Sequence, residues 1–308
     1  MNGWESFFSG GSLTSLDVDT LTRRAEVRRL LAGVGVRPSK RLGQNFLVDR
    51  AAVQAIRAEA AALEPARVVE IGPGLGAVTS LLADLGVPLV GVEVDRRLAE
   101  RLREETARSP SVEIIQADAL TDDFGHAEGE PCVVVGSIPY SITAPLLKHL
   151  VNQRRWISAA VLVTQREVAE KVQASPGSDG SALGVLIRAY ASTRIVRRIP
   201  RGAFLPVPDV DSTLWTIRFH DRPSFEAPEA HFFAVVRAAY GKRRKMLRAS
   251  LKSLADGEAV LTALDRAGID ATRRGEVLSL YELDRLALAL AEVGVFSGAE
   301  LSEETQWR

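Results

Sequence analysis

The sequence predicts an α/β fold in which a parallel β-sheet is covered by helices on both faces. The prediction rests on residues 49–164, where short apolar runs alternate with segments of helical pattern. Each run contains consecutive apolar residues instead of a strict alternation with polar ones, which is typical of strands buried on both faces. Strands that alternate with helices in this way become parallel neighbours in one sheet.

Five strands are expected, one at each apolar run. The first run stops at Gly72 and the fourth at Gly136, and the others end at or beside polar residues. The predicted strands are 67–71, 89–93, 112–116, 131–135 and 159–163. Ligands of such sheets bind beyond the carboxyl ends of the strands. Polar residues at these ends are therefore the first candidates for a site.

Helices are expected between the strands. Asp49 can cap a helix with Val53, Ile56 and Leu63 on its apolar face, and Pro65 would end it. Further helices are predicted at 76–85, 96–107 and 145–151.

The C-terminal part of the chain has a different pattern. Two more strand-like runs, 193–199 and 212–219, are followed from Glu229 by helical patterns alone. A Gly/Ser-rich start and a polar, acidic end are expected to be disordered. The expected division is a leader at 1–20, an α/β domain at 21–220, an all-helical domain at 221–295 and a tail at 296–308.

Composition excludes several classes of protein. A single cysteine and four dispersed histidines give neither a disulfide framework nor the spacing of a metal site. Cys132 lies in an apolar run, so we expect a buried, unreactive thiol. The chain has no apolar run long enough to span a membrane, and its start does not resemble a signal peptide. We expect a cytoplasmic protein without a bound metal and, since no long apolar helix face is evident, a monomer.

A net charge of zero conceals three clusters of basic residues. Such clusters can neutralise phosphates even on a neutral protein. One cluster alone could equally be a solvated helix face, but three together favour a polyanionic partner. The clusters are Arg23, Arg24, Arg28, Arg29, Arg37, Lys40 and Arg41; Arg194, Arg197, Arg198 and Arg201; and Lys242, Arg243, Arg244, Lys245 and Arg248.

A glycine-rich turn follows the first predicted strand. Gly72, Gly74 and Gly76 alternate there, and Glu70 precedes them. Glycine allows a ligand to approach closely and allows positive φ in a tight turn. Dinucleotide-binding folds use a different spacing, G-x-G-x-x-G, to bring a pyrophosphate to a helix N-terminus. The spacing here, with a carboxylate before it, favours a ligand with a cationic amino-acid end.

Two more carboxylates end the next strands. Glu93 lies 21 residues after Gly72, where an acidic side chain can bind both ribose hydroxyls of a nucleoside. The alternative for Glu93 is an ordinary surface carboxylate. Asp118 ends the third strand and can accept a hydrogen bond from an adenine amino group. Together these residues indicate a nucleoside site with an amino-acid end, which fits S-adenosylmethionine better than NAD.

Five ordered motifs extend across residues 37–290. They are 40–47, 136–140, 165–170, 204–212 and 242–248. They resemble motifs of a known family, the small-subunit ribosomal RNA adenine dimethyltransferases. Residues 136–140 stand where that family has Asn-Leu/Ile-Pro-Tyr, residues 204–212 are similar to its F-x-P-x-P-x-V-D-S block, and residues 242–248 resemble its basic C-terminal helix.

The resemblance implies a Rossmann-like S-adenosylmethionine-dependent methyltransferase domain with a smaller all-helical C-terminal domain. Family members methylate two neighbouring adenosines of small-subunit rRNA, each twice, during ribosome assembly. The implied partner is small-subunit rRNA or the assembling small subunit. The expected cofactor-binding residues are Asn45, Leu47, Glu70, Gly72, Gly74, Gly76, Glu93, Asp118 and Ser137. The expected RNA-binding residues are Arg37, Lys40, Arg41, Arg201, Lys242, Arg243, Arg244, Lys245 and Arg248.

The residues after the fourth strand suit methyl transfer to an adenine amine. That amine is a poor nucleophile, so it needs acceptors that hold its N–H groups and direct its lone pair at the sulfonium methyl. The Ser137 side chain and the Ile138 carbonyl are the expected acceptors, and Pro139 would stiffen their turn. Tyr140 can stack on an extruded base, which contributes about 1–3 kcal/mol. Phe204 is the candidate for the opposite ring face.

The alternative for both rings is that they are only core aromatics. The surroundings of Phe204, after Arg201-Gly202-Ala203 and before two prolines, are unusual for a buried strand residue. We therefore expect Phe204 to be accessible to a base.

Ser137 departs from the family's asparagine. A serine hydroxyl is shorter and accepts a hydrogen bond only with its own proton turned elsewhere. One lost acceptor would cost on the order of 1–3 kcal/mol in the transition state, or tenfold to a hundredfold in rate. Whether one or two methyl groups are added is therefore left open by the sequence.

Three other functions are considered. A large-subunit rRNA adenine methyltransferase would share the cofactor site and the stacking rings. A non-catalytic RNA-binding assembly factor would explain Ser137 but would have no use for the cofactor residues. A small-molecule methyltransferase would leave the three basic clusters unexplained.

Overall fold

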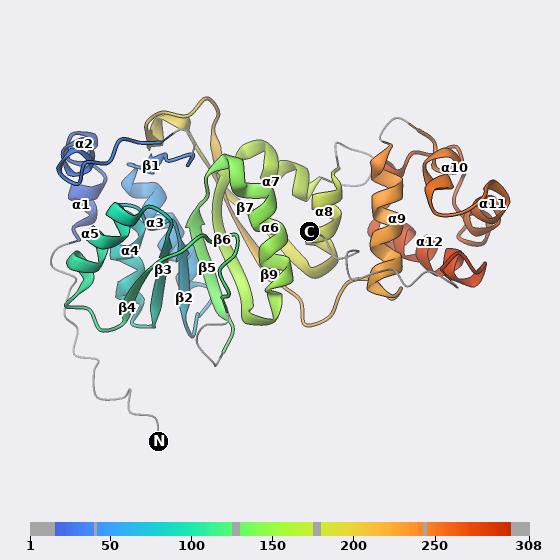
Figure 1. Cartoon of the computed structure of the whole chain (residues 1–308), viewed down its shortest axis with the longest axis horizontal. Helices are drawn as coiled ribbons and strands as arrows, with labels where there is room; N and C mark the ends of the chain where they lie inside the picture. The colour runs from blue at the N-terminus through green and yellow to red at the C-terminus, as the bar shows by residue number, and fades with distance from the viewer. Residues whose placement is uncertain (1–15, 40–41, 125–129, 175–179, 243–244, 297–308) are drawn as a thin grey trace, which may run out of the picture. The chain divides into compact units, whose positions relative to one another are not determined.

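The structure of the 308-residue chain is a computed structural model (Figure 1). It describes residues 16–39, 42–124, 130–174, 180–242 and 245–296. Lys40, Arg41, Arg243 and Arg244, and most of the predicted leader and tail, lie outside the described residues. Residues 16–20 of the predicted leader are described and are ordered, because Leu16 is buried and helix α1 is Val18–Leu21.

A seven-stranded sheet has the order β4-β3-β2-β5-β6-β9-β7. Its strands are β2 Val68–Ile71, β3 Leu89–Glu93, β4 Val112–Gln116, β5 Cys132–Ser137, β6 Ile157–Gln165, β7 Ala191–Ile199 and β9 Ser212–Phe219. Strands β4, β3, β2, β5 and β6 pair in parallel, which confirms the five predicted strands. From β2 the chain adds β3 and β4 on one side of the sheet, and it then adds β5 and β6 on the other side. The switch point therefore lies between β2 and β5, and sheets of this kind bind their ligands at such a point.

The sheet is mixed at its far edge, beyond the five parallel strands that the sequence predicts. Both later strand-like runs join the same sheet, and β9 is antiparallel to β6. A parallel return needs a crossover connection of about a dozen residues or more, usually a helix. Residues 200–211 connect the neighbours β7 and β9 through a short 3-10 turn and the two-residue strand β8, Phe204–Leu205, and they contain no crossover helix.

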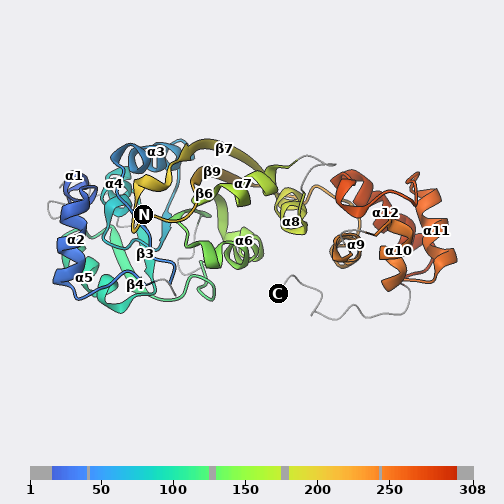
Figure 2. The same ribbon diagram turned by 90° about the horizontal axis from the view of Figure 1, so that it is seen from above.

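Helices lie on both sides of the sheet, as α3 and α6 show in Figure 2. The helices between the parallel strands are α3 Arg50–Ala61, α4 Ala77–Leu82, α5 Arg96–Thr106 and α6 Thr143–Asn152. Asp49 caps α3 as predicted, since its Oδ1 accepts from the Ala52 N–H at 2.7 Å. Apolar side chains of α3 and α4 pack on those of β2, β5 and β6 and form the core under the site.

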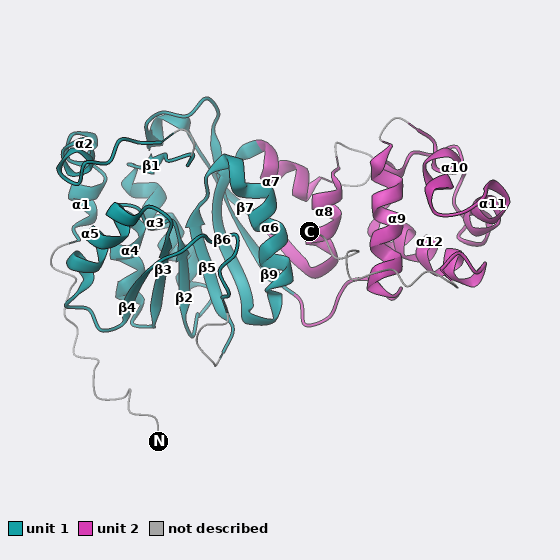
Figure 3. Cartoon of the chain, viewed as in Figure 1, with its two compact units in different colours: residues 1–166, 194–219 teal, residues 167–193, 220–308 magenta. Residues whose placement is uncertain are grey.

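The chain divides into two compact units (Figure 3). The first is residues 1–166 with 194–219, and it holds nearly all of the sheet. The second is residues 167–193 with 220–308 and is mainly helical. Helices α7 and α8 therefore group with the C-terminal helices. The helices of the second unit are α7 Arg166–Gln173, α8 Ala182–Tyr190, α9 Glu229–Gly241, α10 Leu247–Ser250, α11 Gly257–Arg266 and α12 Leu280–Glu292.

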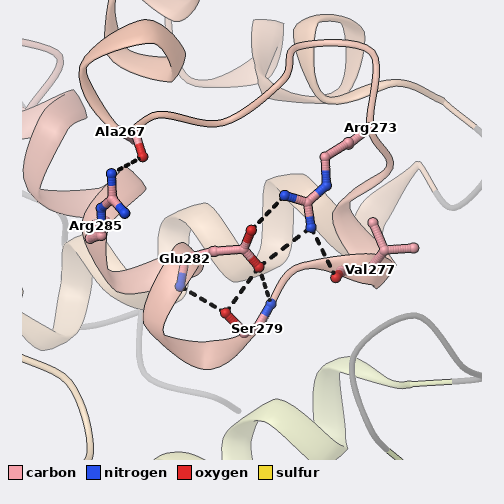
Figure 4. A network of polar contacts seen from close by, with 6 residues as sticks. All are labelled: Ala267, Arg273, Val277, Ser279, Glu282 and Arg285. Carbon is pink, nitrogen blue, oxygen red and sulfur yellow. Dashed lines mark hydrogen bonds and ion pairs between the residues drawn. The ribbon is translucent and has the colours of Figure 1, made fainter.

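A polar network fixes the start of α12 within the second unit (Figure 4). Ser279 caps the helix and forms a capping box with Glu282. The Glu282 carboxylate also accepts from the Arg273 guanidinium at 2.5 Å, and these donors lower its pKa to about 2. Arg273 donates further to the Val277 carbonyl, and Arg285 donates to the Ala267 carbonyl. The network joins the segment that precedes α12 to its first turn.

In the basic segment 242–248, the described residues 242, 245 and 246 lie outside any helix, so the expectation of a basic helix is wrong for them. Helix α9 ends at Gly241, and α10 begins only at Leu247. Met246, between them, forms an isolated β-bridge with Arg274, and the Leu247 N–H donates to the Arg273 carbonyl at 2.8 Å. These backbone bonds to a distant segment replace the helical bonds that the local composition favours.

Candidate functional site

The glycine-rich turn after β2 has the conformation that its sequence predicts. Gly72, Gly74 and Gly76 have φ of 67°, 60° and 92°, in the left-handed region that favours glycine. A Cβ on Gly74 would lie 3.3 Å from Cε1 of Phe46, and one on Gly76 would lie 2.8 Å from Cδ1 of Leu102. A Cβ on Gly72 would meet open space. Side chains therefore pack against the turn at Gly74 and Gly76, whereas the open side of the turn, at Gly72, leaves room for a ligand.

A pocket in the first unit lies at the carboxyl ends of the parallel strands. It brings together every predicted cofactor and catalytic residue except Gly76. Gly76 instead starts α4 and packs on Leu16 and Leu102. The predicted residues that line the pocket are Asn45, Leu47, Glu70, Gly72, Gly74, Glu93, Asp118, Ser137, Ile138, Pro139, Tyr140 and Phe204.

Glu93 lies at the end of β3 and is only 4% exposed. Its Oε2 accepts from the Gly74 N–H at 3.0 Å, and its Oε1 accepts from the Asp95 N–H at 2.9 Å. Burial raises its pKa, and these backbone donors act against that rise. An ordinary surface carboxylate is thus excluded. Glu93 joins the glycine turn to the next strand, and each oxygen keeps a lone pair for a ligand.

Glu70 is a buried carboxyl at the inner wall of the pocket. It is 2% exposed, and its Oε2 has no hydrogen-bond partner among the described residues. Burial raises its pKa to about 8, and nearby Glu93 adds to the rise, whereas Thr79 lowers it. A buried carboxyl with a free oxygen favours a cationic partner, because an unpaired buried charge is costly.

Asp118 and Asn45 lie at the rim. Asp118 is exposed, and its Oδ1 accepts from the Leu120 N–H at 2.9 Å. Asn45 is half-buried, and its amide donates to the Gly43 carbonyl at 3.2 Å. Both side chains hold a local turn and still border the pocket.

A two-stranded sheet joins two motifs that are far apart in the sequence. Strand β1, Phe46–Leu47, is antiparallel to β8, with Leu47 opposite Phe204. The Val48 N–H donates to the Ala203 carbonyl at 2.7 Å. Two-residue strands have no periodicity to detect, so the sequence analysis did not find this pairing. It brings the N-terminal segment to the same pocket as Phe204.

Phe204 is buried, so the expectation that it is accessible is wrong. Its side chain is 2% exposed and packs in the main core. Pairing with Leu47 explains this, because β1 covers the strand that the local sequence did not suggest. Phe204 still lines the pocket. A base could meet only the part of the ring that faces that space.

The segment after β5 has the turn expected of an acceptor site. Ser137 is the last residue of β5 and is partly exposed. The Ile138 N–H donates to the Val163 carbonyl at 2.9 Å, and the Pro139 carbonyl accepts from the Ile142 N–H at 3.1 Å. Tyr140 starts a short 3-10 turn and is half-buried. The backbone of this segment is therefore held from both sides.

Several pocket residues were not identified from the sequence, and three of them stand out. Val94 follows Glu93 and is 48% exposed, which is unusual for an apolar residue at a site wall. Gln44 donates to Asp95 at 3.3 Å and so ties the N-terminal segment to the start of α5. Ser212 lines the pocket from the start of β9. Ser212 and Gln44 belong to motifs noted above, 204–212 and 40–47, whereas Val94 carries no signal in the sequence.

The predicted RNA-binding residues that the structure describes are all exposed. In the first unit these are Arg37 and Arg201, and in the second they are Lys242, Lys245 and Arg248. Part of the Arg194–Arg201 cluster is neutralised, because Arg194 pairs with Glu59 and Arg198 with Asp211.

The described residues contain no group of three or more His, Cys, Asp or Glu that could hold a metal ion. Within the same residues, no helix has the length and apolar character needed to cross a membrane. Cys132 is buried, as predicted, and burial raises the pKa of its thiol to about 11.

The sheet order and this pocket define the class of the protein. Three features fit S-adenosylmethionine: a glycine turn with an open side, a buried carboxyl with a free oxygen, and a carboxylate at the end of β3. The fold is that of a Rossmann-like, S-adenosylmethionine-dependent methyltransferase with a helical C-terminal region.

Comparison with known proteins gives the family. A family model described as ribosomal RNA adenine dimethylase matches residues 36–287. The chain is 40% identical over 287 residues to the ribosomal RNA small subunit methyltransferase A of Pelotomaculum thermopropionicum, covering 88% of this chain and 97% of that protein. With the protein of the same name from Thermobifida fusca it is 39% identical over 280 residues, 89% and 97% of the two chains. The chain belongs to the ribosomal RNA adenine dimethylase family.

Solved structures agree on the fold. The 23S rRNA methyltransferase ErmE matches with a TM-score of 0.65 and 31% identity, over 80% of this chain and all of that one. A dimethyladenosine transferase from Plasmodium falciparum matches with a TM-score of 0.69 and 21% identity, over 80% of this chain and 97% of that one.

Proposed function

We propose that this protein transfers methyl groups from S-adenosylmethionine to the N6 amines of adenosines in small-subunit rRNA, twice on each of two neighbouring adenosines, during ribosome assembly. The observation that carries the proposal is one pocket that contains both the glycine turn of a nucleoside site and the Ser137–Tyr140 segment. The names of the curated relatives, small subunit methyltransferase A, support the choice of RNA. Such a protein would work in the cytoplasm, as a monomer.

The cofactor residues would hold S-adenosylmethionine by complementary charge and shape. Glu70 would face the ammonium group, the open side of the Gly72 turn would take the amino-acid end, and Glu93 would bind the ribose. Asp118 would accept from the adenine amino group, and exposed Val94 would cover the adenine ring. When bound, the cofactor supplies an electrophilic methyl group on a sulfonium.

The substrate side of the pocket would position an adenine amine. The Ser137 hydroxyl and the Ile138 carbonyl would accept its two N–H groups, which leaves the lone pair directed into the pocket. No strong base is needed, because the amine protons acidify as nitrogen bonds to carbon. The Tyr140 ring would stack on the extruded base.

The basic residues would hold the RNA backbone. Arg37 and Arg201 on the first unit, and Lys242, Lys245 and Arg248 on the second, are exposed, so phosphates can reach them. Lys40, Arg41, Arg243 and Arg244, which lie outside the described residues, would add to these clusters. Phosphate contacts position an RNA without reading its sequence, so choice of the adenosine would rest on the pocket.

The test is mass mapping of rRNA treated with the purified protein and labelled S-adenosylmethionine. We expect dimethyladenosine at two adjacent positions of small-subunit rRNA. Label in large-subunit rRNA would point to the type of enzyme that ErmE represents, and no label in either RNA would contradict methyl transfer. Ser137→Asn tests the acceptor role, with an expected rise in the rate of methyl transfer of about tenfold.

A further inference from the structure

Two neighbouring residues at the start of β9 have no role in the proposed function. Ser212 is 0% exposed, and its Oγ lies 2.8 Å from the Tyr140 Oη in a hydrogen bond. Ser212 pairs with Gln165 at the end of β6, so its position is set by the sheet. The phenol of Tyr140 is thus bonded to a rigid point 72 residues away in the sequence.

This bond matters because the backbone bonds of the segment fix the Tyr140 main chain but not the orientation of its ring. Its 3-10 turn is only three residues long, and no side chain caps it. A ring in such a turn can swing about its side-chain torsions, and stacking on a base depends on the orientation of the ring. The hydrogen bond to Ser212 restricts that swing.

Asp211 acts in a similar way on the segment before Phe204. Its Oδ1 accepts from the backbone N–H of Arg201 at 2.8 Å, and its Oδ2 accepts from the Arg198 guanidinium. Arg201 begins the short turn that leads directly into Phe204. The Asp211 carbonyl also accepts from the Arg166 N–H at 3.1 Å. Asp211 therefore ties the start of the Phe204 segment to the end of β6.

We propose that Asp211 and Ser212 are positioning residues for the substrate base: Ser212 orients the Tyr140 ring, and Asp211 holds the turn that places Phe204. The proposal rests on the proposed function, in which these rings take an adenine. Both residues act through a neighbour and do not touch the reacting atoms. A merely structural role would lower stability without changing how a bound base stacks.

The experiment follows the stacking itself, independently of methyl transfer. A short RNA carries 2-aminopurine, a fluorescent adenine analogue whose emission is quenched when it stacks on tyrosine. Emission of the bound probe is measured with the wild type, with Tyr140→Ala as the level for a lost ring, and with Ser212→Ala. We expect Ser212→Ala to restore part of the emission and to lower kcat about threefold to tenfold, with KM for S-adenosylmethionine unchanged.

Coupled variants separate positioning from folding. Tyr140→Phe keeps the ring and removes the other partner of the bond, so it should match Ser212→Ala, and the double variant should lose no more than either single variant. Thr106→Val is the matched control, because Thr106 is also buried and its hydroxyl also makes one bond of 2.8 Å, to the Leu102 carbonyl. The control should change stability only.

The Asp211 half is tested with two variants. Asp211→Asn keeps an oxygen that can accept from the Arg201 N–H, whereas Asp211→Ala removes it. We expect Asp211→Ala to weaken probe stacking more than Asp211→Asn does. The two variants should have the same thermal stability.

Several results would overturn the proposal. One is a double variant, Ser212→Ala/Tyr140→Phe, whose loss in kcat is the product of the two single losses. The others are probe emission that stays unchanged in Ser212→Ala, and a wild type that does not quench the probe at all. If quenching behaves as expected but no small-subunit rRNA is methylated, the proposed substrate fails and the positioning roles stand.

Discussion

The ionisation of Glu70 should control the affinity for S-adenosylmethionine. Without a ligand its pKa is raised to about 8 by burial. If the ionised carboxylate is the form that binds the ammonium group, the protein must lose this proton before or during binding. At pH 6, two units below that pKa, only about 1% of Glu70 is ionised. Affinity should therefore rise about tenfold per pH unit well below pH 8, and about fiftyfold in all between pH 6 and pH 8.

The assay is the dissociation constant of S-adenosylmethionine by calorimetry between pH 6 and pH 9. The amine of the ligand also titrates near pH 8, so the useful quantity is the ratio of the wild-type constant to that of Glu70→Gln. Glutamine has nearly the same shape but no charge, and the ligand titration cancels in the ratio. A ratio that stays constant across this range would refute the role of Glu70.

The same group should make the ligand-free protein less stable as pH rises. Its folded pKa of about 8 lies above the ordinary value of 4.5, so the folded state holds the proton more tightly. The resulting stability is fully present below pH 4.5 and is lost as pH rises through 8. The full shift corresponds to at most about 5 kcal/mol. In Glu70→Gln this part of the pH dependence should disappear from urea unfolding curves, and its persistence would count against the assignment.

Three further predictions concern other parts of the first unit. Glu93→Ala should weaken S-adenosylmethionine binding by at least tenfold, since it removes the ribose acceptor and releases two backbone N–H groups, whereas exposed Glu100→Ala should leave calorimetric affinity unchanged. Gly74→Ala should cost about 1–2 kcal/mol and lower Tm by a few degrees, and it should also weaken binding; Gly86→Ala, also at positive φ but with open space around it, should lower Tm alone. Cys132 should resist thiol reagents at pH 8 until the protein unfolds, and stoichiometric labelling of the folded protein would contradict its burial.

Much of the fold follows from local sequence pattern. The strand 67–71 is mainly apolar and does not alternate strictly with polar residues, which predicts burial on both faces, and all four residues of β2 are buried. Glu93 was found because it ends a strand next to the glycine turn. Gly72 was found because the turn requires positive φ. Each of these signals lies within a few residues of the feature that it predicts.

The wrong predictions concern contacts between distant residues. Phe204 is buried because Leu47, over 150 residues earlier, pairs with it, and two-residue strands have no pattern. The basic segment was expected to be helical, but Met246 bonds to Arg274 instead. The hydrogen bond between Tyr140 and Ser212 likewise depends on the register of β9. Local composition holds no information on such partners.

A crystal structure of the protein with S-adenosylmethionine would test the central claim most directly. We predict the amino-acid end beside the Gly72 turn and Glu70, the ribose on Glu93, and the methyl group directed toward Ser137 and Tyr140. A ligand bound elsewhere, or a methyl group directed away from the Ser137–Tyr140 segment, would contradict the account.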